Sequence, residues 1–393
     1  SRKSAMTQTM AMSALVRGFP ASGIRKMFER AQRYDNVVAF TFGEPDFDTP
    51  DFIKQAAKQA LDDNQTRYVS NLGMPVLREA IAERYSARWN RPVEAENVAV
   101  AVGGMEALLL AIESVVNPGQ DVLVPEPGYP NYLGQIRFVG ANVVPLPIRA
   151  EAGFKLQAVD VLDRITENTG PIILNSPPNP LGRRIDSDEL RKIVQGANER
   201  GVVIISDEVY EDIVFEGNVH TSVGQLDEPR MRHIVVNSFS KSFAMTGWRC
   251  GWLIADPELV AKMGPLKEGL TSCVAPFVQL AGVAALRDGA EFTSQLTSTF
   301  QERRDAVVAA VDATEGLHLA KPEGAFYAFI DIRGTGLAAE DFAHRLLDQE
   351  RVCLVPGTAF GELGAGHVRL SFATSVDTIQ LGFDRIARFI STI

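Results

Sequence analysis

The chain has little cysteine, no long apolar run and no excess of positive charge. Its 393 residues include three cysteines, far apart and odd in number, so we expect a reducing compartment and no disulfide framework. No run of about 18 apolar residues is present, which argues against a membrane span. The formal net charge of -10 argues against a nucleic-acid binder, because such proteins usually present a basic face.

The sequence also lacks the spacing of a metal site and the core of a signal peptide. The five histidines show no metal-ligand pattern, so we expect no metal. Residues 1–16 begin with basic side chains but are then too polar for a signal peptide, and we expect a mobile arm there. These features together predict a cytoplasmic protein. With 46% apolar and 22% charged residues, the composition is that of a globular protein long enough for two domains.

Short β-branched runs alternate with helix-length segments from about residue 95. The runs are 97–102, 121–128, 142–148, 170–178, 201–210, 233–240 and 250–256. This alternation predicts an α/β fold, with a mostly parallel seven-stranded-type sheet flanked by helices. The last two runs follow each other too closely for a helical crossover, so we expect an antiparallel strand in that pair.

The pattern changes after about residue 287. A long charged helix is predicted first, and strands and helices then mix in the manner of a smaller α+β domain. We therefore predict a large domain over residues 46–287. Residues 1–45 and 288–393 would form an N-terminal arm and a small C-terminal domain.

Glycine and polar residues follow four of the predicted strands. They are Gly103, Gly104, Met105, Asn179, Asp207, Tyr210, Ser238, Ser240, Lys241 and Arg249. Each has an ordinary structural explanation, such as a tight turn, a helix cap or a surface lysine. Ligands bind outside the carboxyl ends of strands in open parallel sheets, so the joint placement predicts a phosphate-capable pocket containing an amine.

Lys241 is unusual because it follows an apolar run. Burial of a cation is costly unless it has a partner. Either the side chain points to solvent, or it does chemistry as a neutral or covalently bound amine.

At these residues the chain closely resembles the pyridoxal-phosphate-dependent aminotransferases of class I/II, the aspartate aminotransferase superfamily of fold type I. The resemblance covers nearly the whole chain. Its motifs, in family order, are GEPDFDTP, RYVSNLGMPVLREAIA, GGMEAL, PGYPNY, NSPPNPLG, SDEVY, SFSKSFAMTGWRCGW, PEGAFYAF and HVRLSFA. Such an ordered set is highly specific.

The resemblance implies that the large domain binds pyridoxal 5'-phosphate. Lys241 would be the Schiff-base lysine and would move the proton during catalysis. Asp207 would pair with the pyridine nitrogen, and Tyr210 and Asn179 would hydrogen-bond the phenolic oxygen. Tyr129 would stack on the ring.

The resemblance also implies a phosphate site that is shared between two subunits. It would comprise Ser238, Ser240, Arg249, the backbone around Gly103, Gly104 and Met105, and Tyr68 from the neighbouring subunit. Arginine suits this role because its planar fork binds phosphate oxygens in pairs. A homodimer with two-fold symmetry is therefore expected.

Arg369 matches the arginine that binds the substrate α-carboxylate in this family. Gly43 and Phe326 would lie beside the substrate, together with Asn179. The family's dicarboxylate enzymes use a second arginine, in some subgroups from the neighbouring subunit, and residues 265–277 contain Lys267 and Glu268 but no arginine. A dedicated aspartate or glutamate enzyme is therefore weakly disfavoured.

The expected function is transfer of an amino group from an L-amino acid to a 2-oxo acid by a ping-pong mechanism. The same scaffold could also carry a β-lyase, a decarboxylase, an elimination enzyme or an oxygen-dependent oxidase. A non-enzymatic sensor would need a DNA-binding module, for which we expect no room at the N-terminus. A nicotinamide dehydrogenase would need a dinucleotide fingerprint that the sequence does not contain.

Overall fold

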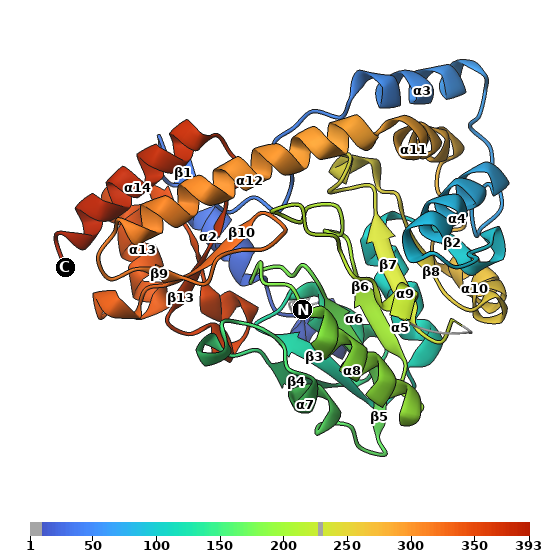
Figure 1. Cartoon of the computed structure of the whole chain (residues 1–393), viewed down its shortest axis with the longest axis horizontal. Helices are drawn as coiled ribbons and strands as arrows, with labels where there is room; N and C mark the ends of the chain where they lie inside the picture. The colour runs from blue at the N-terminus through green and yellow to red at the C-terminus, as the bar shows by residue number, and fades with distance from the viewer. Residues whose placement is uncertain (1–9, 227–230) are drawn as a thin grey trace, which may run out of the picture.

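A seven-stranded sheet with helices on both faces forms the larger part of the molecule (Figure 1). The computed structural model describes residues 10–226 and 231–393. Helix α12 (Ala290–Asp312) runs from the large sheet to a smaller antiparallel sheet at the other end. Most of the arm predicted at residues 1–16 lies outside the described residues; its last part begins helix α1 (Ala14–Gly18).

The strand order in the large sheet is β2-β8-β7-β6-β5-β3-β4. The strands are β2 (Val98–Ala101), β3 (Asp121–Glu126), β4 (Asn142–Pro147), β5 (Thr169–Asn175), β6 (Ile204–Asp207), β7 (Ile234–Ser238) and β8 (Gly251–Ile254). Strand β8 is antiparallel to both β7 and β2, and the other neighbours are parallel. The predicted α/β sheet and its antiparallel pair are therefore confirmed.

Both faces of the central strands are buried, which explains their continuous apolar runs. Ile172 and Ile204 pack on the side of helix α8 (Ser187–Glu199). Their neighbours Ile173 and Ile205 point the other way and pack in the cluster of helix α5 (Gly103–Val115). Successive strand residues point to opposite faces, so a strand covered on both sides has no polar alternation.

The remaining helices cover the sheets or join them. They are α2 (Gly23–Ala31), α3 (Asp51–Asp62), α4 (Pro75–Trp89), α6 (Asn131–Phe138), α7 (Ala158–Leu162), α9 (Val223–Leu226), α10 (Pro257–Leu270), α11 (Pro276–Asp288), α13 (Ala339–Glu350) and α14 (Val376–Ile390). Among the described residues, no helix is both long enough and apolar enough to cross a membrane.

The smaller part contains a four-stranded antiparallel sheet and a two-stranded parallel one. The four strands are β12 (Val355–Pro356), β13 (His367–Ser371), β10 (Tyr327–Asp331) and β9 (His318–Leu319). The two-stranded sheet pairs β1 (Val38–Ala39) with β11 (Val352–Cys353). The residue after β1, Phe40, accepts a hydrogen bond from the backbone of Ser371 at 2.8 Å. The N-terminal segment is thereby fixed to the small sheet.

Helix α14 packs directly on this N-terminal segment through Gly382. A methyl group at Gly382 would lie 2.3 Å from the ring of the fully buried Phe40. We expect Gly382→Ala to lower the free energy of unfolding by about 1–3 kcal/mol, because the overlap must be relieved by backbone or ring movement. Thermal unfolding followed by circular dichroism measures the loss.

Gly269, in the last turn of α10, provides the matched control. A methyl group there meets nothing within 4 Å. Gly269→Ala should leave stability unchanged or raise it by up to about 1 kcal/mol, as helix propensity predicts. Equal melting temperatures for the two variants would contradict the packing argument.

Candidate active site

One cavity of about 820 Å³ brings together most of the residues expected from the strand ends. Those that line it are Gly43, Gly104, Met105, Tyr129, Asn179, Asp207, Tyr210, Ser238, Ser240, Lys241, Arg249 and Arg369. Parallel strands β5, β6 and β7 end at the same edge of the sheet, and residues at or just beyond their ends contribute to the lining. The small sheet supplies Arg369 from β13.

Lys241 follows β7 and reaches across to the N-terminal segment. Its Nζ donates a hydrogen bond to the carbonyl oxygen of Gly43 and lies 5.7 Å from the ring centre of Tyr210. Burial lowers the pKa of Lys241 to about 8, although Glu44 and Asp207 act in the opposite direction. A larger fraction of this amine is therefore uncharged near neutral pH than of an ordinary lysine, and the uncharged amine is the nucleophile.

Asp207 ends strand β6 and is buried. Its Oδ2 accepts a hydrogen bond from the Tyr132 hydroxyl at 2.6 Å, and Oδ1 accepts one from the Val209 backbone at 3.3 Å. Burial raises the pKa of Asp207 to about 6 against the effect of these two hydrogen bonds. Such a carboxylate is ready to share a proton with a basic nitrogen in the cavity.

Arg369 is a fully buried cation with no ion pair to a carboxylate among the described residues. Its Nη1 donates to Asn179 Oδ1 and its Nη2 to the carbonyl oxygen of Thr41, both at 2.9 Å. Its Nε has no hydrogen-bond partner. Burial lowers the pKa of Arg369, and the ring of Tyr327 lies 4.7 Å below the guanidinium. This arrangement is a receptor for an anion.

The N-terminus of α5 forms a second anion-binding corner. Gly103 has φ +73° and its missing side chain leaves space for Arg249, whose Nη2 would be 2.3 Å from a methyl group there. Ser238 Oγ donates to Ser240 Oγ at 2.8 Å, and both hydroxyls line the cavity. Backbone N–H groups, hydroxyls and a guanidinium in one corner match the requirements of a phosphate group.

Three residues expected at the site do not line the cavity. Gly103 lies behind Arg249 and acts through that close approach. Phe326 is 0% exposed but lies near the cavity wall, with its ring centre 5.8 Å from Lys241 Nζ, and its neighbour Tyr327 lines the cavity. Tyr68 is 91% exposed and does not reach the cavity of its own chain.

Two tyrosines of the cavity were not predicted from the sequence. Tyr132 contacts Asp207, and Tyr327 shares a 2.8 Å hydrogen bond with the hydroxyl of Tyr210. A signal for Tyr132 existed, because it lies three residues after Tyr129 and so on the same face of a helix turn. Burial raises the pKa of Tyr129 to about 12 and also raises the pKa values of Tyr132 and Tyr327. These three phenols therefore keep their protons at neutral pH.

Helix α2 also contributes to the cavity, which no sequence motif predicted. Four of its residues, Ile24, Arg25, Phe28 and Glu29, line the cavity together with the flanking Ser22 and Gln32. Their position depends on the packing of the N-terminal segment against the small sheet.

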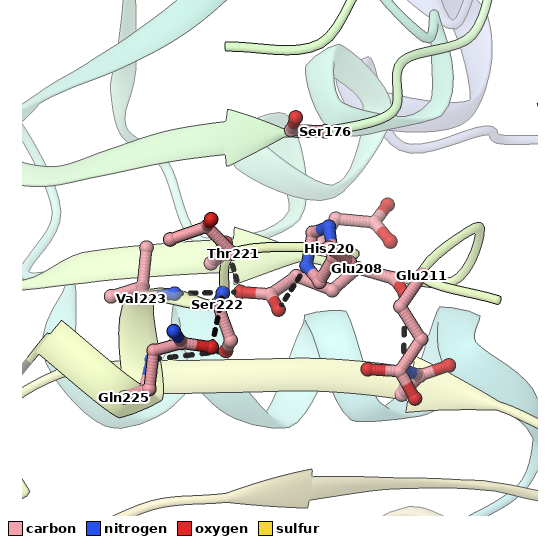
Figure 2. Close-up of polar contacts among 12 residues, drawn as sticks. Ser176, Glu208, Glu211, His220, Thr221, Ser222, Val223 and Gln225 are labelled. Atoms are coloured by element: carbon pink, nitrogen blue, oxygen red, sulfur yellow. Dashed lines mark hydrogen bonds and ion pairs between the residues drawn. The ribbon is translucent and has the colours of Figure 1, made fainter. Parts of the chain in front are cut away.

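Two residues that follow Asp207 in sequence, Glu208 and Glu211, form a largely buried polar cluster with His220 (Figure 2). His220 Nε2 is 2.7 Å from Glu208 Oε1, and Glu208 Oε2 accepts from the Val223 backbone at 3.2 Å. Burial alone would lower the pKa of His220, but Glu208 raises it above the ordinary value.

The ligand atoms of this cluster are spaced as in a metal site, but its carboxylates already have partners within the protein. Ligand atoms of Glu208, Glu211 and His220 lie within 4.8 Å of one another. However, Glu211 is paired with Arg88 at 3.1 Å and accepts from Tyr85 at 2.7 Å. The carboxylates thus already have partners, and the cluster fixes the segment that carries Asp207 and Tyr210.

Known aminotransferases match this chain over nearly its full length. The model of the family Aminotransferase class I and II matches residues 35–386. An aspartate aminotransferase of Pyrococcus horikoshii is 38% identical over 93% of this chain and 94% of its own. Aromatic-amino-acid aminotransferase 2 of Thermococcus litoralis is 35% identical over 96% and 98%.

Solved structures agree. The aspartate aminotransferase of Thermus thermophilus with maleate superimposes with a TM-score of 0.91 at 33% identity, covering 97% of this chain and 100% of that one. The match extends over the large sheet, the small sheet and the cavity between them. The chain therefore belongs to the aminotransferase class I and II family.

Proposed function

We propose that the cavity holds pyridoxal 5'-phosphate through Lys241 and transfers an amino group from an L-amino acid to a 2-oxo acid in two half-reactions. The family is one of aminotransferases that generally use this cofactor. Ping-pong kinetics follow, because one cavity serves both substrates in turn.

The observation that carries the proposal is the meeting of three groups in one cavity. Lys241 has a lowered pKa of about 8, and Asp207 has a raised pKa of about 6. The buried guanidinium of Arg369 has no carboxylate partner among the described residues, and its Nε is unsatisfied. An aldehyde, a ring nitrogen and a carboxylate are the ligand groups that complement these three side chains.

The fit to the cofactor extends to its other groups. Ser238, Ser240, Arg249 and the N-terminus of α5 would hold the phosphate. Tyr210 and Asn179 would donate to the phenolic oxygen; Asn179 has its Nδ2 for this, because its Oδ1 already accepts from Arg369. Tyr129 would contact the ring.

Each side chain then has a definite task. When bound, the cofactor supplies an electron-withdrawing ring. Asp207 holds a proton at the ring nitrogen, and the hydrogen bond from Tyr132 fixes the orientation of that carboxylate. Lys241 carries the proton that leaves the substrate Cα, and Arg369 orients the substrate by its α-carboxylate.

The quaternary structure and domain division are also part of the proposal. The exposed Tyr68 supports a homodimer in which it contacts the phosphate of the neighbouring subunit. Residues 46–287 would form the cofactor-binding domain, with residues 1–45 and 288–393 forming the small domain. Arg369 and Lys241 would then come from different domains.

Lys241→Ala tests the central assignment. We expect turnover to fall by about 100- to 10,000-fold, because the variant loses both the amine that joins the cofactor and the proton carrier. Borohydride reduction should no longer attach the cofactor to the chain. The assay follows absorbance of the bound cofactor during titration with single amino acids and reversal by a 2-oxo acid.

Lys192→Ala is the matched control, since Lys192 is an exposed lysine on α8. It should behave as the unsubstituted protein in both measurements. Full turnover by Lys241→Ala would refute the assignment. Release of carbon dioxide, or a requirement for oxygen, would instead overturn transamination.

Asp207→Asn should change the pH dependence of stability in the cofactor-free protein. The folded pKa of Asp207, about 6, lies above its ordinary value of 3.8, so the folded state binds the proton more tightly. Stability contributed by this group is present at low pH and is lost as pH rises between these values. The melting temperature of Asp207→Asn relative to the unsubstituted protein should therefore rise from pH 4 to 6 and then level off.

The same experiment needs a control and an activity measurement. Asp188→Asn, at a carboxylate that is 90% exposed and outside the cavity, is measured in parallel as the control variant. Transamination by Asp207→Asn should fall at neutral pH, because the ring nitrogen loses its charged partner. If the difference in melting temperature between Asp207→Asn and the unsubstituted protein does not change with pH, the raised pKa of Asp207 is contradicted.

A further inference from the structure

The segment Thr41–Gly43 spans the distance between the two cations of the cavity. The Thr41 carbonyl accepts from Arg369, and the Gly43 carbonyl accepts from Lys241. In the proposed function the amino acid has its carboxylate at Arg369 and its amino group toward Lys241. The side chain between the two carbonyls is that of Phe42, which lines the cavity.

Phe42 is an aromatic side chain exposed within the cavity. It is 43% exposed and belongs to the cavity lining. Phe28 of α2 also lines the cavity and is 49% exposed. Ile24 and Met105 extend the same apolar lining, and the Met105 sulfur lies 3.7 Å from the Tyr129 hydroxyl. An apolar group placed here would remove this surface from water.

The described part of the cavity offers no unpaired cation for a second carboxylate. Lys241, Arg249 and Arg369 have the roles proposed above, which leaves Arg25 as the remaining cation of the lining. Arg25 forms an ion pair with Glu29 at 3.0 Å.

Lys267, the basic residue singled out in residues 265–277, does not provide that cation. It is 0% exposed and paired with Glu106 at 2.9 Å, outside the cavity lining. The remaining charged side chains of the lining, Arg25, Glu29 and Glu44, sum to -1. This balance disfavours an acidic substrate side chain.

We propose that the preferred amino donors are neutral amino acids with large apolar side chains, such as phenylalanine, leucine and methionine, and that Phe42 and Phe28 contact that side chain. This inference rests on the proposed function and names its substrate class. The enzyme should favour these donors over aspartate, although several of its relatives are named aspartate aminotransferases.

The test measures the donor half-reaction of the holoenzyme with L-phenylalanine, L-leucine, L-alanine and L-aspartate. We expect kcat/KM for L-phenylalanine to exceed that for L-aspartate by at least tenfold. Phe42→Ala should lower kcat/KM for L-phenylalanine by roughly 10- to 100-fold, the usual effect of lost apolar contact in a specificity pocket. L-alanine, which does not reach the apolar wall, should change less than about threefold.

Two further variants make the result specific. Phe52→Ala removes a partly exposed phenylalanine of α3 outside the cavity and should leave both donors unchanged. Arg25→Ala should leave kcat/KM for L-phenylalanine unchanged. If L-aspartate is the best donor and Arg25→Ala abolishes its reaction, the proposal is overturned.

The other outcomes are equally distinguishable. If Phe42 is instead covered by a second copy of the chain, Phe42→Ala will weaken the dimer in sedimentation and affect both donors alike, which also overturns the proposal. If no amino acid reacts and borohydride fixes no cofactor to Lys241, the proposed function itself fails. Reaction of every donor at equal rates leaves the aminotransferase intact and removes only the specificity inferred here.

Discussion

The structure depends on two cations, one partly and one fully buried, that have no carboxylate partner among the described residues. Lys241 and Arg369 both have lowered pKa values because of burial, and backbone carbonyls of Gly43 and Thr41 are among their hydrogen-bond acceptors. A carboxylate at either place would neutralise the charge that the ligand has to meet. The cavity therefore carries uncompensated positive charge that an anionic ligand group, such as a phosphate or a carboxylate, can neutralise.

This arrangement requires the N-terminal segment to be held firmly. Strand β1 pairs with β11, and Phe40 is hydrogen-bonded to Ser371 and packed under Gly382 of α14. Phe40, Ser371 and Gly382 do not line the cavity, yet their contacts place the two carbonyls that face the cations. The packing of the small sheet is thus linked to the properties of Lys241, which comes from the large sheet.

The back of the site is as constrained as its front. Asp207 accepts a hydrogen bond from Tyr132 on the cavity side. Of the residues that follow it, Glu208 is paired with His220 (Figure 2), and Glu211 forms an ion pair with Arg88. Buried polar networks of this kind stabilise one arrangement when every group has a partner. A raised pKa at Asp207 can persist because its surroundings cannot relax around the charge.

The sequence alone determined the α/β sheet, its antiparallel pair and the strand-end residues, because apolar periodicity and parallel topology bring strand ends to one edge. It also indicated Lys241 and Arg369 through their motifs. Only the tertiary structure decided that Tyr327 rather than Phe326 lines the cavity and that Lys267 forms an ion pair with Glu106. Strand alternation and ion pairing between distant segments set these details, and neither is visible until the chain is packed.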